Sequence, residues 1–291
     1  MDTITHTLFG LGLYGAVNKR DMDKNTKRAY LLTAVGASQI PDIDVISRLW
    51  DTEGLYQMWH RGITHSVFLT PVWALLFFLL SFLLFKVKDK KLFLLGWLAV
   101  FIHNTSDLFN AWGTGYLEPF SNMRITFGTI PIVDLVIWFI MGTAFIYARR
   151  NKLKSPYYFR VAWAFLLVHV IIQSTQGFII YKQYDDQYDQ VALSADFIPW
   201  TFSVITKKDD EVIIFNDNLF KKEETQYVLQ SRETADLDKL FSQRPEARTL
   251  YEWSPFVVLV DDDERLGLYD PRFYRNGQSF LFEYIEKNTE R

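Results

Sequence analysis

Residues 66–85 read SVFLTPVWALLFFLLSFLLF, and this stretch decides the class of fold. It lies in a run of 24 residues, between Arg61 and Lys86, that carries no formal charge when His65 is neutral. A helix that crosses a bilayer needs about 20 largely apolar residues. A soluble surface helix would also show a polar face, which this stretch lacks. The stretch therefore predicts a membrane-spanning helix and argues against a soluble helical bundle.

Five more segments of the first part of the chain share this low charge and high apolar content: residues 3–17, 29–46, 92–110, 127–148 and 161–181. The third and fourth each contain one acid, Asp107 and Asp134 respectively. The first two are short, so they cross only partly or lie buried against the others. We expect an α-helical integral membrane bundle of about six membrane segments, of which the first two are short.

The charge distribution divides the 291 residues into two parts. Residues 1–181 hold 28 of the 65 charged side chains and are net basic, whereas residues 182–291 hold the other 37 and are net acidic. We expect a membrane domain over 1–181 and a polar domain over 182–291. The second part has short strand-like runs at 202–207, 211–216, 225–231, 256–262 and 279–285, and a helix-like stretch at 236–243.

These runs predict a small α+β domain, mostly β, outside the membrane. It contains no nucleophile or phosphate-binding motif, so we interpret it as a lid or a binding module, with structural support as the alternative. The chain has no cysteine, which excludes a disulfide-stapled scaffold and a zinc ribbon.

Three short basic loops set the expected orientation in the cytoplasmic membrane. Residues 18–28 carry five bases, and residues 86–91 and 149–154 carry four each. Such loops stay cytoplasmic. A multi-pass chain would then place residues 47–65, residues 111–126 and the C-terminal domain on the extracytoplasmic side.

This orientation gathers seven metal-type ligands at one membrane level, on the extracytoplasmic side: His6, Asp42, Asp44, His60, His65, His103 and Asp107. The spacing of His103 and Asp107 puts both on one helical face. Taken singly, this pair also fits a structural hydrogen bond, and the PDID around Asp42 also fits a helix cap. Ionisable groups inside a membrane domain are costly, so the joint pattern favours a functional site. His169 lies apart and is typical of an interhelical hydrogen bond.

Imidazoles and carboxylates without thiolates favour zinc, with iron or manganese as alternatives. The number of ligands suits one or two divalent ions, which activate hydroxide near neutral pH. Asp42 or Asp44 would bridge or orient that hydroxide, and one of them would act as general base. Arg61 and Arg124 could grip a phosphate; contact with lipid headgroups is an equal alternative.

The combined pattern resembles a known family. MDxxTHxxxG, PDxD, HRGxTHS, HxxxDxxNxxGT and PFS are similar to motifs of the YdjM-type membrane-bound metal-dependent hydrolases, over about residues 1–150. A more distant likeness is to the ligand order of zinc-dependent phospholipase C and P1-type nucleases. It implies metal ligation by His6, Asp42, His65, His103 and Asp107. The later His and HxxxE ligands of that group have no counterpart here, since no glutamate follows His169 four residues on.

Three functions remain open. A membrane-bound hydrolase of lipid-derived esters or phosphoesters is favoured, because such substrates reach the site by diffusion in the membrane. The alternatives are a metal or envelope sensor without turnover, and a metal transporter. A transporter would distribute ligands along the depth of the bundle and often shows an inverted repeat, neither of which is visible here. We expect membrane lipid as a partner and no nucleic acid.

Overall fold

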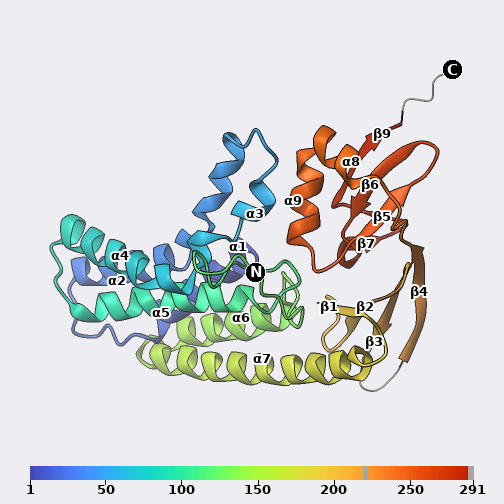
Figure 1. Cartoon of the computed structure of the whole chain (residues 1–291). Coiled ribbons are helices and arrows are strands. Elements are labelled where there is room, and N and C mark those ends of the chain that lie inside the picture. Colours follow the sequence, from blue (N-terminus) through green and yellow to red (C-terminus); the bar gives the residue numbers. More distant parts are fainter. Residues whose placement is uncertain (219–221, 288–291) are drawn as a thin grey trace. The chain divides into compact units, whose positions relative to one another are not determined.

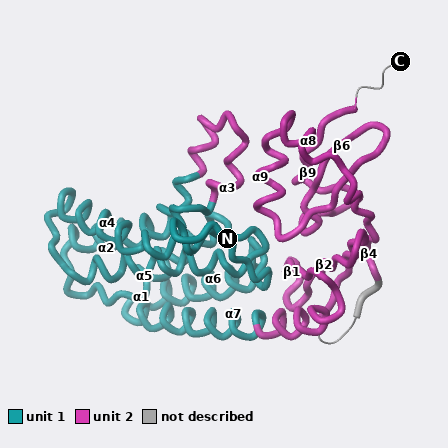
Figure 2. Tube along the Cα trace, in the orientation of Figure 1, with its two compact units in different colours: residues 1–44, 61–174 teal, residues 45–60, 175–291 magenta. Residues whose placement is uncertain are grey.

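The computed structural model describes residues 1–218 and 222–287, and the chain divides into two compact units. Unit 1 comprises residues 1–44 and 61–174, and unit 2 comprises residues 45–60 and 175–291 (Figure 2). Unit 1 is helical, whereas unit 2 contains all of the named strands (Figure 1).

The helices within unit 1 are α1 (Thr3–Ala16), α2 (Lys24–Ala37), η2 (Ile63–His65), η3 (Val67–Leu69), α4 (Thr70–Phe85), α5 (Lys90–Asp107), α6 (Leu135–Arg150) and η4 (Lys152–Lys154). η1 (Ile40–Leu49) and α7 (Ser155–Asp185) begin in unit 1 and end in unit 2. Local sequence sets several boundaries. Asp2, Asp89 and Asp134 cap the first turns of α1, α5 and α6 with their carboxylates.

Small residues bring the helices of unit 1 close together. Ala34 and Ala99 are almost completely buried in a cluster with Phe77. A Cβ atom at Gly36 of α2 would lie 2.2 Å from the ring of Phe77 in α4, so only glycine fits there without a shift. This packing fixes α1, α2, α4 and α5 against one another and so fixes the ends of these helices.

The connections α1–α2, α4–α5 and α6–α7 lie at one end of unit 1. Arg20 in the first connection donates to the carbonyl of Leu153 in the third at 3.1 Å. Tyr30 of α2 donates to Asp89 before α5 at 2.5 Å. The predicted cytoplasmic loops therefore gather in space, and the start of α1 and the end of α5 lie at the other end.

The prediction of about six membrane segments is wrong. Among the described residues, two helical stretches are long and apolar enough to cross a membrane: Val67–Phe85, with a mean hydropathy of 2.4, and Lys152–Asp185, with 1.6. α1 and α2 have 14 residues each and reach only about 21 Å, less than the roughly 30 Å of a bilayer core. The expected segment 127–148 is helical only from Leu135 onward, because Asp134 caps the first turn of α6. α6 therefore has 16 residues. α5 has 18 residues but includes Lys90, Lys91 and Asp107.

The described residues of unit 2 form three antiparallel sheets, with strand orders β1-β2-β3-β4, β5-β6-β9 and β7-β8. Its strands are β1 (Gln190–Ala195), β2 (Phe202–Lys208), β3 (Glu211–Asp217), β4 (Lys222–Gln230), β5 (Val258–Asp261), β6 (Arg265–Tyr269), β7 (Tyr274–Arg275), β8 (Gln278–Ser279) and β9 (Phe282–Glu286). Its helices are α3 (Tyr56–Trp59), α8 (Leu237–Gln243), α9 (Pro245–Trp253) and η5 (Pro271–Phe273). The sheets bury Ile205, Ile214 and Val258 in one core. A separate, mostly β part is therefore present, as the sequence predicts.

Candidate metal centre

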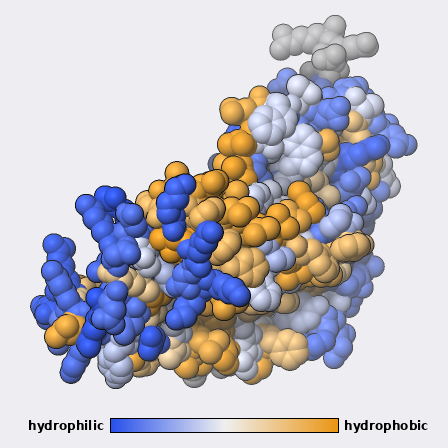
Figure 3. Space-filling view, turned by 90° about the vertical axis from the view of Figure 1, so that its left-hand side faces the viewer, coloured by the Kyte–Doolittle hydropathy of each residue, from blue (hydrophilic) through white to orange (hydrophobic). Residues whose placement is uncertain are grey.

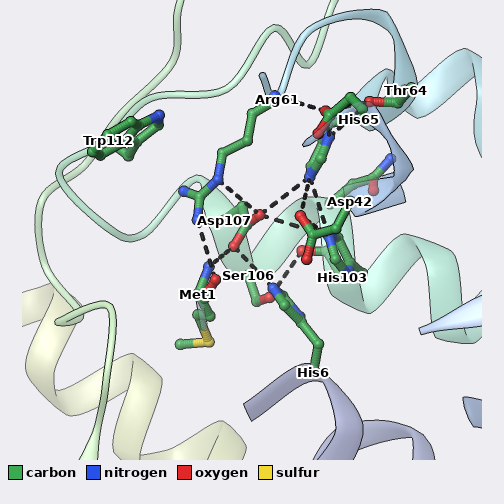
Figure 4. Close-up of polar contacts among 12 residues, drawn as sticks. Met1, His6, Asp42, Arg61, Thr64, His65, His103, Ser106, Asp107 and Trp112 are labelled. Carbon is green, nitrogen blue, oxygen red and sulfur yellow. Dashed lines mark hydrogen bonds and ion pairs between the residues drawn. The ribbon is translucent and has the colours of Figure 1, made fainter. Parts of the chain in front are cut away.

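Four chain segments of unit 1 bring polar side chains to one point (Figure 4). α5 ends at Asp107 and carries His103 one turn earlier on the same buried face. Asp42 lies at the start of η1, shortly after α2 ends. His65 closes η2, immediately before the apolar stretch that begins at Val67. Asp2 caps α1, whose first turns place His6 in the interior.

Asp42, His65, His103 and Asp107 form a group that could hold a metal ion, with ligand atoms within 4.8 Å of one another. Nε2 of His65 lies 3.1 Å from Nε2 of His103 and 3.4 Å from both Asp42 Oδ1 and Asp107 Oδ2. Nε2 of His103 lies 3.6 Å from Asp42 Oδ1 and 3.7 Å from Asp107 Oδ2. Donors bonded at 2.0–2.1 Å to a tetrahedral ion are about 3.4 Å apart. The four donors therefore have the spacing of one coordination sphere.

The hydrogen bonds on the far side of each ring fix where the protons lie. Nδ1 of His103 is 2.7 Å from the carbonyl oxygen of Ser38, which can only accept, so Nδ1 donates. Nδ1 of His65 faces Asp44 Oδ2 at 3.3 Å and the hydroxyl of Thr64 at 3.1 Å. That hydroxyl already donates to Asp44, so Nδ1 of His65 also donates.

The Nε2 atoms of the two imidazoles face each other and two carboxylates. Burial lowers the pKa of His103 to about 4, so this ring is neutral at pH 7. The lone pair of the neutral His103 ring and two carboxylates around one point repel one another unless a cation lies among them. The residues present fit a divalent ion.

Asp44 is positioned differently from Asp42 although only one residue separates them. Its Oδ2 accepts hydrogen bonds from the backbone nitrogen of Arg61 at 2.9 Å and from Thr64 Oγ1 at 2.7 Å, and lies behind His65. Asp44 therefore orients a histidine and lies outside the group of four. A carboxylate behind a histidine is the usual support of a metal-ligating imidazole.

His6 lies beside the group and shares Asp107 with it. Its ring stacks on that of His103 at a centroid distance of 3.6 Å, and its Nε2 lies 3.3 Å from Asp107 Oδ1. Burial lowers the pKa of His6 well below its usual value, so the ring is neutral. Among the described residues, neither of its ring nitrogens has a hydrogen-bond partner. Asp107 thus directs Oδ2 toward His65 and His103 and Oδ1 toward His6.

Arg61 and Arg124 form hydrogen bonds and ion-pair contacts beside the group of four. The Arg61 backbone is left-handed, with φ of 57°, and its guanidinium places Nε 3.4 Å from Asp107 Oδ2. It also donates to Asn110 Oδ1 at 2.8 Å and to the carbonyl of Met1 at 3.2 Å. Arg124 donates to the carbonyl of Arg61 at 2.9 Å. The amino group of Met1 contacts Asp107 Oδ1.

The remaining histidines lie elsewhere. His60 belongs to unit 2, where its ring stacks on Tyr56 at 5.5 Å. His169 lies 2.9 Å from Asp134 Oδ2, so the expected interhelical hydrogen bond is present. Met1 and Asn110 also contact residues of the site, and neither was predicted from the sequence as a site residue. Asn110 follows Asp107 by three residues, a helical spacing that could have indicated it.

The fold and the site define a membrane-associated helical protein with a buried His/Asp cluster that can hold a metal ion. The family model described as "YdjM inner membrane protein" matches residues 1–178, so the chain belongs to the YdjM family. The resemblance to the YdjM family, which the sequence motifs indicate, is confirmed.

The chain is also similar to a Bacillus subtilis (strain 168) protein named "Uncharacterized protein YfhP". The two are 28% identical over 222 residues, which cover 71% of this chain and 65% of the relative. The matched part is thus just under two thirds of the relative's length. No solved structure matches the chain.

Proposed function

We propose that this protein is a membrane-bound metal-dependent hydrolase with its metal held by Asp42, His65 and His103 together with Asp107. One observation carries the proposal: two imidazole Nε2 atoms lie 3.1 Å apart between two carboxylates, while each Nδ1 faces an acceptor on the far side of its ring. Such an arrangement is unfavourable for stability alone and favourable for a cation. Two nitrogen and two oxygen donors at tetrahedral spacing favour zinc.

A second ion would bind on the other side of Asp107. Oδ1 of this carboxylate faces His6 and contacts the amino group of Met1, which a second ion would displace, whereas Oδ2 faces His65 and His103. A carboxylate directed both ways is what a two-metal site requires of a bridging ligand. Because His6 is fully buried and its ring nitrogens have no hydrogen-bond partner among the described residues, ligation would also satisfy an otherwise costly group.

A bound divalent ion would polarise an ester or phosphoester oxygen and make hydroxide available near neutral pH. Residues of the chain would supply the general base and orient the ligands. Asp42 is the most accessible of the four ligands, with an exposed side-chain fraction of 18%, so we assign it the general-base role at the opening of the site. Asp44 orients His65, and Arg61 positions Asp107.

A lipid-derived substrate fits the surroundings of the site. His65 lies two residues before the candidate span Val67–Phe85, which puts it near the level where a bilayer meets water. Exposed apolar side chains flank the ligands: Ile43 next to Asp42, and Ile63 two residues before His65. The basic stretches 86–91 and 149–154 flank the other ends of the two candidate spans, so we propose that the site faces the extracytoplasmic side.

Metal content tests the site. Full-length protein purified in detergent should contain zinc by elemental analysis. His103→Ala and Asp107→Ala should each lose most of it, because each removes a direct ligand. The matched control is His169→Ala, which removes another buried histidine of unit 1, one that contacts Asp134. Full metal retention in both ligand variants would refute the metal site.

Turnover is tested separately. Zinc-loaded protein should hydrolyse a fluorogenic phospholipid or bis-p-nitrophenyl phosphate, and Asp42→Asn should lower kcat while keeping part of the metal. The burial of His6, His65, His103 and Asp107 favours a second candidate, a closed metal site of a sensor. A loaded protein that turns over neither class of ester would favour the sensor and contradict the hydrolase.

A further inference from the structure

An apolar groove runs between α6 and α7 within unit 1. It has a volume of about 400 Å³ and is lined by Phe139, Thr143 and Tyr147 of α6 and by Val161 and Phe165 of α7. None of the described residues that line it is charged. Phe139 and Phe165 are 74% and 61% exposed, so the groove opens at the outside of unit 1. Since α7 belongs to a candidate membrane span, this opening is suited to hydrocarbon.

A basic pocket of about 380 Å³ lies at the end of the same two helices. Within the described part of the chain, its lining contains four cationic residues, Lys19, Arg20, Lys27 and Lys152, and no acidic residue. Among the described residues, none of the four forms an ion pair with a carboxylate. The acid Asp23 lies nearby in sequence and caps the start of α2. Four cations around one pocket create a positive potential that attracts an anion.

The groove and the pocket adjoin along α6. Ala144 and Tyr147 line the groove, and Ala148 lines the pocket, so less than one helical turn separates them. Figure 3 faces this end of unit 1 and shows hydrophilic side chains gathered beside a hydrophobic surface. An occupant of both sites must have a compact anionic group joined to an apolar chain.

We propose that unit 1 binds an anionic phospholipid here, with its phosphate in the basic pocket and an acyl chain in the α6–α7 groove. Basic pockets between membrane helices recognise lipid headgroups in this way. The site lies at the opposite end of unit 1 from the metal centre and therefore serves as a lipid contact distinct from the proposed reaction. A free phosphate would fill the pocket alone and leave the groove without an occupant.

Native mass spectrometry of the full-length protein in detergent tests the headgroup, with dioleoyl phosphatidylglycerol and dioleoyl phosphatidylcholine at equal concentrations. Wild type should bind phosphatidylglycerol about tenfold more tightly. The combined variant Lys19→Gln, Arg20→Gln and Lys152→Gln should lose this preference. The control is Lys88→Gln, Lys90→Gln and Lys91→Gln, which changes the same charge at the same end of unit 1. An equal loss of this lipid preference in both variants would contradict headgroup binding in the pocket and indicate general charge attraction.

The groove is tested with Val161→Trp, which fills it, against Val168→Trp, which adds the same bulk to α7 outside it. The first should weaken phosphatidylglycerol binding about tenfold and the second less than twofold. On wild type, dihexanoyl phosphatidylglycerol should bind more weakly than the dioleoyl lipid. Millimolar inorganic phosphate should not displace the dioleoyl lipid. Displacement by phosphate, or equal binding of the short-chain and long-chain lipids, would contradict acyl-chain binding in the groove. This test holds even if Val161→Trp fails to fold.

Discussion

Asp44→Asn probes the proposed metal centre without removing any of its four ligands. Oδ2 of Asp44 faces the backbone nitrogen of Arg61 at 2.9 Å, Thr64 Oγ1 at 2.7 Å and Nδ1 of His65 at 3.3 Å. Asparagine keeps the volume but loses the charge that fixes the proton on Nδ1. Losing such a supporting carboxylate typically weakens metal binding about 10–100-fold, or about 1.4–2.7 kcal/mol.

Zinc affinity is measured by competition with a chelating fluorophore, on metal-stripped protein in detergent. Asp134→Asn is the matched control, because Asp134 also pairs with a buried histidine, His169, at 2.9 Å. Asparagine caps a helix as well as aspartate does, so the control keeps the cap of α6, loses only the charge beside His169 and should leave the zinc affinity unchanged. An affinity of Asp44→Asn within twofold of wild type, or an equal loss in Asp134→Asn, would show that Asp44 does not support metal binding by His65.

Three further predictions concern topology, packing and charge. Single cysteines in intact cells should react with an impermeant reagent at Asn218 and stay unlabelled at Lys88; the reverse pattern would invert the proposed orientation. Gly36→Ala should destabilise the protein by about 1–3 kcal/mol, because its Cβ would meet an aromatic ring of α4, whereas Gly142→Ala, with open space around it, should stabilise by about 0.5–1 kcal/mol in thermal unfolding. Burial and the nearby Lys27 lower the pKa of Lys19 to about 8, so raising the pH from 7 to 9 removes most of its charge and should weaken phosphatidylglycerol binding. A Lys19→Gln variant that shows the same pH dependence would contradict this assignment.

The central ligands could be predicted because their signal is local. His103 and Asp107 are one helical turn apart, and Asp42 and His65 lie beside helix ends. Spacing could not separate Asp42 from Asp44, because η1 directs one into the group and the other behind His65. The interior position of His6 beside Asp107 depends on packing between α1 and α5, which lies beyond any local motif.

The number of membrane helices could not be predicted from apolar content. Segments such as 3–17 and 29–46 are apolar because they pack against neighbouring helices, as the burial of Ala34 and Phe9 shows. Hydropathy reports removal from water and does not distinguish lipid from protein as the surroundings. In unit 2, the run QVALSA of β1 alternates too weakly to be recognised, and pairing with β2 stabilises it.

The four-ligand group draws its donors from η1, η2 and α5, and His6 adds α1. The chain has no cysteine, so no disulfide can join these segments. A bound ion would act as a reversible cross-link between helices that the sequence keeps far apart. At a free concentration one hundred times its Kd, an ion that binds only the folded chain adds about 2.7 kcal/mol to stability. The stability of unit 1 would then depend on the concentration of free metal in its surroundings.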